Sequence, residues 1–325
     1  LKSTNTKASD SIGKTTGKVQ VAKTVNVPVL AYGITNWWTS ALVVPVATTD
    51  VKVDTGFVKS SNGNRFHDYI ATQDYKRRTA EEMRKKTTDA INYSATDKNY
   101  DKVEGFTETE IADVVLVNKF KGIESKRWNL GYKQTLTLPT GRELDTNRVI
   151  DAPSGDGQWD VGIGAVTEYM PLARDSWKIV LATGYTFQLP DYGSRRIPES
   201  SDSKLSEDID DDTRFDLGDI FYAQLGTKIG IAPGFGFVLG SSYQHKEADK
   251  FNGGKYNSRR YSILDEDTEE EMTSALAGLS YSTIPFFKQK SYAVPWEMGL
   301  SYAKILAGRN INRADLLQFE MAMFF

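Results

Sequence analysis

Residues 177–189 read WKIVLATGYTFQL and have two faces of different chemistry. One face is mostly apolar and consists of Trp177, Ile179, Leu181, Thr183, Tyr185, Phe187 and Leu189. The other consists of Lys178, Val180, Ala182, Gly184, Thr186 and Gln188. A period of two residues is typical of a β-strand. Since a tilted strand crosses the apolar band of a membrane in about 9–11 residues, this stretch predicts a membrane-spanning strand.

The same alternation recurs along the chain. It is clear in residues 128–138 and 159–169. Similar stretches lie near residues 18–32, 37–55, 110–120, 214–230, 235–246, 272–284, 292–306 and 313–325, and the pattern is less regular in 37–55 and 110–120. Together with 177–189, the sequence predicts eleven strands.

The segments between these stretches alternate between two classes of length. The short class covers residues 33–36, 121–126, 171–176, 231–234 and 285–291. The long, charged class covers residues 56–109, 139–157, 190–213 and 247–271. Short turns at one end and long loops at the other are typical of outer-membrane barrels. The predicted fold class is therefore all-β, a transmembrane antiparallel up-and-down β-barrel.

The expected number of strands is about 12, within a range of 10–14, because bacterial single-chain barrels have even strand counts. The strand beyond the eleven would come from residues 1–16 or from residues 56–109. We expect residues 1–325 to form a single barrel domain, with a flexible or strand-forming segment at 1–17. Residues 57–109 would form an extracellular or lumenal insert, with an amphipathic helix over residues 75–86 and a cap at Thr79.

Composition excludes several other classes of protein. Charged residues make up 26% of the chain and the mean hydropathy is −0.45, values that do not fit a bundle of membrane helices. A net charge of −3 without a basic block makes nucleic acid an unexpected partner. Cysteine is absent, which excludes disulfide scaffolds and thiolate metal sites and fits an oxidising compartment.

The predicted location is the outer membrane of a Gram-negative bacterium, with the C-terminus periplasmic and the long loops extracellular. In this orientation a set of aromatic residues falls at the height of the short turns. Such rings form a girdle at a membrane interface, and the expected partners are outer-membrane lipids and lipopolysaccharide. The girdle comprises Trp128, Tyr169, Trp177, Phe235, Tyr292 and Phe325.

The polar faces of the strands would line the interior and set selectivity through charge and size. The lumen-facing candidates are Lys133, Asp160, Glu168, Lys178, Gln188 and Gln224. This arrangement predicts a passive, porin-like channel for small solutes. Many inward glycines, Gly164 and Gly184 among them, instead favour a constricted interior. The alternative is therefore a structural barrel that self-associates as a homo-oligomer and organises membrane lipid.

Enzymatic chemistry is not expected. The chain has only two histidines, His67 and His245, and neither has a serine or aspartate placed to complete a hydrolase site. The acidic runs at residues 207–212 and 265–271 lack the ligand spacing of a calcium loop. Nucleotide motifs fail on spacing. We therefore predict no catalytic residues, no metal site and no cofactor.

Two resemblances refine this prediction. The C-terminal residues Leu317, Phe319, Met321, Met323 and Phe325 resemble the signal that outer-membrane barrels present to the barrel assembly machinery. Residues 32–36 (YGITN), 112–116 (ADVVL), 119–120 (KF), 138–141 (LPTG) and 155–164 (GDGQWDVGIG) resemble the outer-membrane transporter family called MetA-pathway of phenol degradation. That resemblance covers roughly residues 30–190. It implies a barrel related to the fatty-acid and aromatic-hydrocarbon channels, and passage of small apolar or aromatic compounds.

Overall fold

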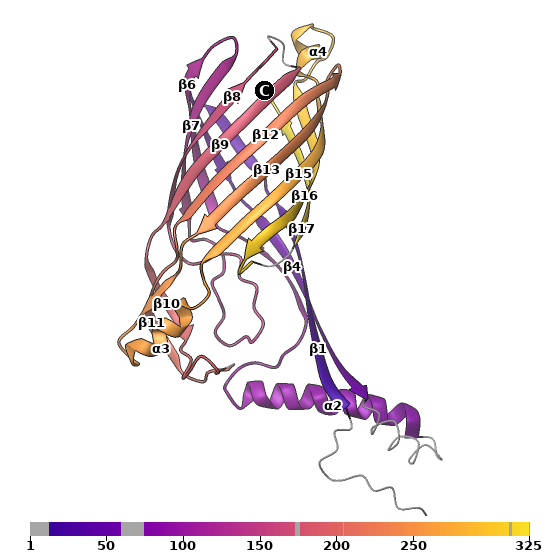
Figure 1. The fold of residues 1–325 in the computed structure, drawn as a ribbon, viewed down its shortest axis with the longest axis vertical. Coiled ribbons are helices and arrows are strands. Elements are labelled where there is room, and N and C mark those ends of the chain that lie inside the picture. Colours follow the sequence, from indigo (N-terminus) through magenta and orange to yellow (C-terminus); the bar gives the residue numbers. More distant parts are fainter. Residues whose placement is uncertain (1–12, 60–74, 173–175, 204, 312–313, 325) are drawn as a thin grey trace, which may run out of the picture.

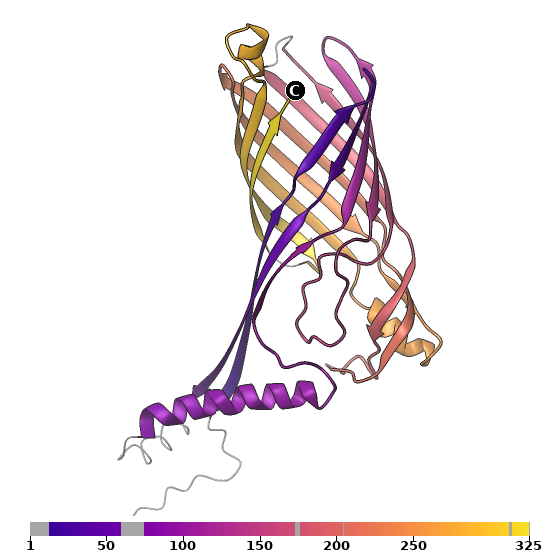
Figure 2. The same ribbon diagram turned by 180° about the vertical axis from the view of Figure 1, so that it is seen from behind.

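The computed structural model describes residues 13–59, 75–172, 176–203, 205–311 and 314–324. Its largest element is an antiparallel sheet of eleven strands that curls round on itself (Figures 1 and 2). In spatial order the strands are β17 (Asp315–Met323), β16 (Trp296–Arg309), β15 (Glu270–Ser282), β13 (Phe235–Lys246), β12 (Ile220–Ala232), β9 (Trp177–Gln188), β8 (Asp160–Tyr169), β7 (Trp128–Leu138), β6 (Val114–Glu124), β3 (Trp38–Val43) and β2 (Val29–Gly33).

The two edges of this sheet are β17 and β2, and no ladder joins them within the described residues. Successive strands of the sheet are antiparallel, so the first and the eleventh run in the same direction. Closing the sheet requires either a parallel pair or one further strand. The described parts of residues 1–16 and 56–109 do not supply that strand, because they form β1, the end of β4, α2 and β5. The predicted count of twelve stays a prediction, since residues 1–12 and 60–74 lie outside the described residues.

The first hairpin is interrupted by proline. The split separates β1 (Gly13–Asn26) from β2, and β3 from β4 (Val46–Lys59). Pro28 and Pro45 lie at these breaks and have no N–H to donate to a ladder. The two arms stay together because Val44 N–H donates to Pro28 O at 3.1 Å. The stretch expected at 37–55 is thus two strands that lie in different sheets.

Two small sheets lie beyond the end of the large sheet that carries the long connections (Figure 1). One consists of β1, β4 and β5 (Phe106–Ile111). The other consists of β10 (Asp191–Arg196), β11 (Ile209–Asp216) and β14 (Lys250–Asn252). The long connections expected at 190–213 and 247–271 therefore contain regular structure, including α3 (Ser258–Asp265).

The predicted helix is present but longer than expected. It is α2 (Tyr75–Thr96), so Thr79 lies inside the helix and is not its cap. It crosses the far end of the β1–β4 hairpin, outside the interior of the large sheet (Figures 1 and 2). Ala95, near its C-terminal end, is 1% exposed. Tertiary packing therefore extends the helix beyond the charged stretch that predicted it.

The opposite end carries the short turns and the C-terminal strand's end (Figure 2). The connection between β15 and β16 contains α4 (Ile284–Lys288). Because this short helix occupies the turn, β16 begins at Trp296 and not at the expected residue 292. Within the described residues, no helix has the length and apolarity that crossing a bilayer requires.

Burial is inverted relative to a water-soluble protein. The fully buried large side chains include Ile197, Phe215 and Tyr261, which belong to the extension beyond the large sheet. On the large sheet, apolar side chains such as Leu181 (48% exposed) and Leu225 (53% exposed) stay uncovered on the outer face. A continuous apolar surface of this kind requires an apolar environment.

Candidate lumenal site

The inner face of the large sheet contains a row of four residues in direct register. Lys133 on β7 pairs with Gly164 on β8, Gly164 pairs with Gly184 on β9, and Gly184 pairs with Tyr222 on β12. Side chains alternate between the two faces of a strand, so the row lies opposite the exposed apolar face. Lys133 and Tyr222 at the ends of this row have long side chains, whereas the two glycines between them have none.

The missing side chains allow Lys133 and Tyr222 to meet across two strands. The Lys133 ammonium lies 5.1 Å from the centroid of the Tyr222 ring, a cation–π contact. A Cβ at Gly184 would lie 2.5 Å from the ring of Tyr222, and a Cβ at Gly164 would lie 2.9 Å from its hydroxyl. Three strand spacings separate β7 from β12, roughly 14 Å. The glycines are therefore required for the ring to lie flat against the wall.

The remaining lumen-facing candidates lie on the same inner face but take no part in the contact between Lys133 and Tyr222. Glu168 accepts a hydrogen bond at 3.2 Å from Asn129, its cross-strand partner. Lys178 pairs with Lys228 across β9 and β12. Gln224 lies two residues from Tyr222 on β12 and is exposed. The structure thus distributes these side chains along the inner wall.

Asp160 and Gln188 are direct partners at the other end of β8 and β9, near the long connections. Both side chains are buried, as is Gln158, which precedes β8 on the same face. The side chains of Gln158 and Gln188 lie beside the carboxylate of Asp160. The sequence indicated Asp160 and Gln188 but not Gln158, because Gln158 lies outside the strand whose alternation was read.

Residues 139–159 connect β7 to β8 and are held by an ion-pair network. Arg142 binds Asp151 with both guanidinium NH₂ groups at 2.9 Å, and its Nε donates to Glu110 at 2.6 Å. Arg148 donates to both oxygens of Glu108, at 2.7 and 2.9 Å. Because Glu108 and Glu110 lie on β5, the network joins this connection to the sheet β1–β4–β5 (Figure 2).

The protonation states of this network follow from its contacts. The hydrogen bonds from Arg148 hold the pKa of Glu108 below its usual value. Burial pushes the pKa of Asp151 upward, but the hydrogen bonds from Arg142 and the backbone outweigh it and the net shift is downward. The hydrogen bond to Asp151 raises the pKa of Arg142. Glu108, Asp151 and Arg142 therefore stay charged near neutral pH.

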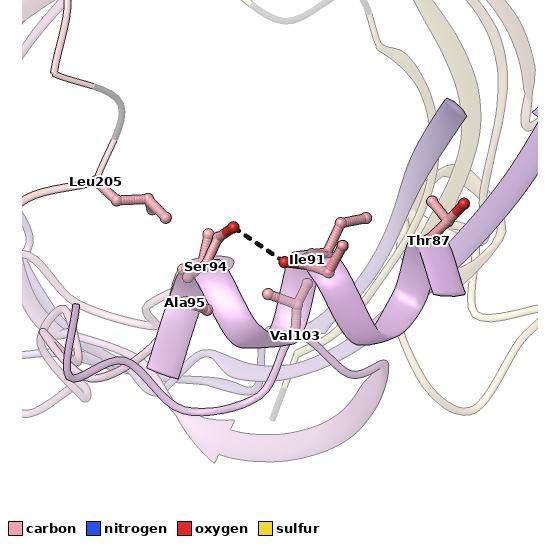
Figure 3. A pocket seen from close by; sticks show the side chains of 8 residues that line it. Thr87, Ile91, Ser94, Ala95, Val103 and Leu205 are labelled. Carbon is pink, nitrogen blue, oxygen red and sulfur yellow. Dashed lines mark hydrogen bonds between the residues drawn. The ribbon is translucent and has the colours of Figure 1, made fainter. Parts of the chain in front are cut away.

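A second feature of the extension is a pocket of about 290 Å³ under α2 (Figure 3). Ile91 and Ala95 on α2 line it together with Val103, Val149 and Leu205. Its walls are mainly methyl groups, and Ser94 donates its hydroxyl to the helix backbone at Ala90 O. The pocket offers contact with apolar groups but few directed polar contacts.

Five of the six predicted girdle residues lie within the described residues, at the short-turn end. Trp128 and Tyr169 are cross-strand partners with ring centroids 4.4 Å apart. Trp177 begins β9, and Phe235 begins β13 with Tyr281 at 4.5 Å. Tyr292 precedes β16 and is exposed, whereas Phe325 lies outside the described residues.

The residues of the predicted assembly signal share one face of β17. Leu317, Phe319, Met321 and Met323 pair in turn with Tyr302, Leu300, Met298 and Trp296 of β16, and all four are exposed. The terminal Phe325 again lies outside the described residues.

Of the two histidines, only His245 lies within the described residues. His245 lies on β13 with its Nδ1 3.9 Å from Glu271, and His67 lies outside the described residues. No three acidic, histidine or cysteine side chains within the described ranges gather as metal ligands.

The chain matches a family model and aligns with the solved structure of an outer membrane channel. A family model described as "Putative MetA-pathway of phenol degradation" matches residues 3–265. The crystal structure of an outer membrane channel from Pseudomonas putida F1 aligns with a TM-score of 0.50 at 14% identity, covering 96% of this chain and 85% of that chain. OmpT, an outer membrane protein of Vibrio cholerae, aligns at a TM-score of 0.31 and 8% identity, covering 92% of this chain and 89% of that one. The first alignment shows a shared fold, the second is too weak to do so, and no curated protein matches the sequence.

Proposed function

We propose that this chain, which belongs to the MetA-pathway of phenol degradation family, is an outer-membrane channel for small solutes. The observation that carries the proposal is the contrast between the two faces of one curled sheet. The outer face exposes apolar side chains such as Leu181 and Leu225. The inner face carries Lys133, Tyr222 and Gln224. A sheet of this kind fits lipid on one side and an aqueous pathway on the other.

The proposed orientation places the short turns and the C-terminus in the periplasm and the two small sheets outside the cell. The girdle pairs Trp128–Tyr169 and Phe235–Tyr281 would then lie at the periplasmic interface. Outer-membrane lipid would cover the apolar face, and lipopolysaccharide would surround the long connections. Closure of the wall, with a twelfth strand between β17 and β2, belongs to this proposal.

The proposed solutes are small and apolar or aromatic. The Tyr222 ring lies against Gly184 of the inner wall, and the Lys133 ammonium lies 5.1 Å from its centroid. An aromatic solute that carries a hydroxyl or carboxylate would contact both groups. This feature would favour such solutes over purely aliphatic ones of the same size.

The test is conductance of the purified protein in planar lipid bilayers. We expect discrete steps, and we expect a phenol-sized aromatic carboxylate to reduce the current of the wild type more than that of Tyr222→Ala. Substitution of the exposed Tyr93 on α2 by alanine is the matched control and should behave as the wild type. A protein that folds but gives no conductance at any voltage would contradict the channel.

A second candidate function, a structural barrel that self-associates, is favoured by the two sheet edges. Leu30 on β2 and Leu317 on β17 are 76% and 71% exposed, and neither edge has a partner strand in the described residues. Edges of this kind pair readily with another chain. Cross-linking in lipid separates the two functions, because a non-conducting oligomer joined through these edges would support the structural role.

A further inference from the structure

The place where residues 139–159 meet the wall of the large sheet contains buried polar atoms without partners. Gln158 is 0% exposed, its amide lies beside the Asp160 carboxylate, and no donor reaches its Oε1. Asp160 is 9% exposed with Oδ1 unpartnered, and Gln188 is 7% exposed with Oε1 unpartnered. Each buried, unpaired polar group costs roughly 1–3 kcal/mol. The three oxygens in one place are therefore available to a cation or to ordered water.

Asp156 joins these three residues into one cluster. Its Oδ1 accepts a hydrogen bond from Gln158 N–H at 3.1 Å, and its Oδ2 accepts one from Gln188 Nε2 at 3.4 Å. Asp113 holds the same turn from the other side, accepting from Gly141 N–H at 2.8 Å and from Asp156 N–H at 3.3 Å. The cluster is thus built by the connecting segment and by strands β8 and β9 together.

The backbone is folded tightly round this cluster. A Cβ at Gly155 would lie 2.5 Å from Oδ1 of Asp113, and Gly157 has φ +86°. Both positions require glycine. The segment GDGQWD therefore has a physical reason for its glycines, which bring its carboxylates and amides against the wall.

The charge of this region is unbalanced. The carboxylates of Asp113, Glu143, Asp156 and Asp160 lie close enough to influence one another's charge, and Arg195 is a nearby guanidinium that Glu143 and Asp156 attract. Burial raises the pKa of Asp156, with the charge of Asp113 adding to the effect. Burial also lowers the pKa of Arg195, although Glu143 and Asp156 attract its charge. A cation placed among the oxygens would relieve both the repulsion and the unpaired acceptors.

We propose that Asp156, Gln158, Asp160 and Gln188 bind a hard cation, Ca²⁺, at the junction between residues 139–159 and the inner wall. Carboxylate and amide oxygens completed by water are the ligands that Ca²⁺ accepts, in flexible geometry. Because two carboxylates and two amides form the site, it does not suit zinc or copper, which take nitrogen and sulfur ligands. With so few charged ligands, a Kd of about 10⁻⁴–10⁻³ M is expected.

The proposed site would restrain the movement of the β7–β8 connection. Bound Ca²⁺ would join the segment that carries Asp156 to strands β8 and β9, close to the opening of the curled sheet. The site would hold the β7–β8 connection in place independently of the Arg142–Asp151 pair. This property does not depend on conductance, so a barrel that conducts nothing would still bind the ion.

Isothermal titration of Ca²⁺ into chelator-treated, detergent-folded protein tests the proposal. The wild type should show one saturable site, and Asp160→Asn and Gln158→Leu should each raise Kd at least tenfold. Glu168→Gln, which removes a carboxylate from the same face of the same strand, should leave Kd unchanged. Retained heat-modifiable mobility on gels establishes that each variant folds.

A second measurement follows the segment itself. Ca²⁺ should slow hydrogen exchange within residues 139–159 in the wild type and in Glu168→Gln, but not in Asp160→Asn. Absence of saturable binding in the folded wild type would overturn the site, and the unpaired atoms would then be filled by water alone. Equal Ca²⁺ affinity in the wild type and Asp160→Asn would also overturn it.

Discussion

At the scale of single residues, two glycines determine where the Tyr222 ring lies on the inner face. Gly164 and Gly184 lie side by side on β8 and β9, so the ring of Tyr222 reaches over them to the ammonium of Lys133. Alternation in the sequence places all four residues on the inner face. It does not reveal the contact, because the register between β7, β8, β9 and β12 depends on turns and bulges distant from these residues.

Adding a methyl group at Gly184 should displace the ring into the lumen. The Cβ of Gly184→Ala would lie 2.5 Å from Tyr222, so the ring must rotate away from the wall. We expect a lower single-channel conductance and a loss of about 1–3 kcal/mol of stability from overpacking. Gly226→Ala is the control, because its Cβ would lie at an ordinary 3.5 Å from Leu239 O on the same inner face. Equal conductance in the two variants would contradict the assigned position of the ring.

Arg142 should be the residue on which the β7–β8 connection depends most. The side chain of Asp151 is 1% exposed, and Arg142 supplies its closest positive charge. Arg142→Ala should cost about 3 kcal/mol, because it leaves a buried carboxylate poorly compensated. Hydrogen exchange within residues 139–159 should accelerate about a hundredfold. Lys52→Ala removes an exposed ion pair and should change nothing measurable. Unchanged exchange in Arg142→Ala would show that other contacts hold the segment.

At the scale of elements, the strands were predictable and the long connections were not. The alternation in 128–138 and 177–189 gives β7 and β9 almost residue for residue. The small sheet β10–β11–β14 was not predicted, because Arg214 and Phe215 pair with Asn252 and Phe251, distant in sequence. Pairing of that kind leaves no periodic signal within either segment.

The pairing of β5 with the β7–β8 connection should depend on pH. The folded-state pKa of Glu108 and of Asp151 lies below the usual value. Their stabilisation is therefore complete above the unfolded-state pKa and is lost as the pH falls through the folded-state value. Relative to the intrinsic exchange rate at each pH, amides within residues 139–159 should be strongly protected near neutral pH and weakly protected at about pH 3. Glu108→Gln should reduce this dependence, whereas Glu104→Gln, at an exposed position, should not. A protection factor that does not change with pH would contradict the role of the network.

At the scale of the whole molecule, the sequence predicts a protein whose apolar side chains face outward and whose polar side chains face the interior. The alternating faces and the two classes of connection indicate a curled antiparallel sheet with its apolar side outward. They do not predict how the wall closes, because closure depends on whether β2 and β17 meet each other or a further strand. Nor do they predict the cluster around Gln158, whose members come from a connection and two strands.

The central claim is that the outer face contacts lipid and the inner face contacts water. The chain has no cysteine, so single cysteines can be introduced along β12 without background. Spin labels at Phe221, Leu225 and Ile229 should be accessible to oxygen dissolved in lipid and shielded from a water-soluble nickel chelate. Labels at Tyr222, Gln224 and Lys228 should show the reverse. The account predicts this alternation with a period of two residues, and equal accessibility of both sets to the nickel chelate would contradict it.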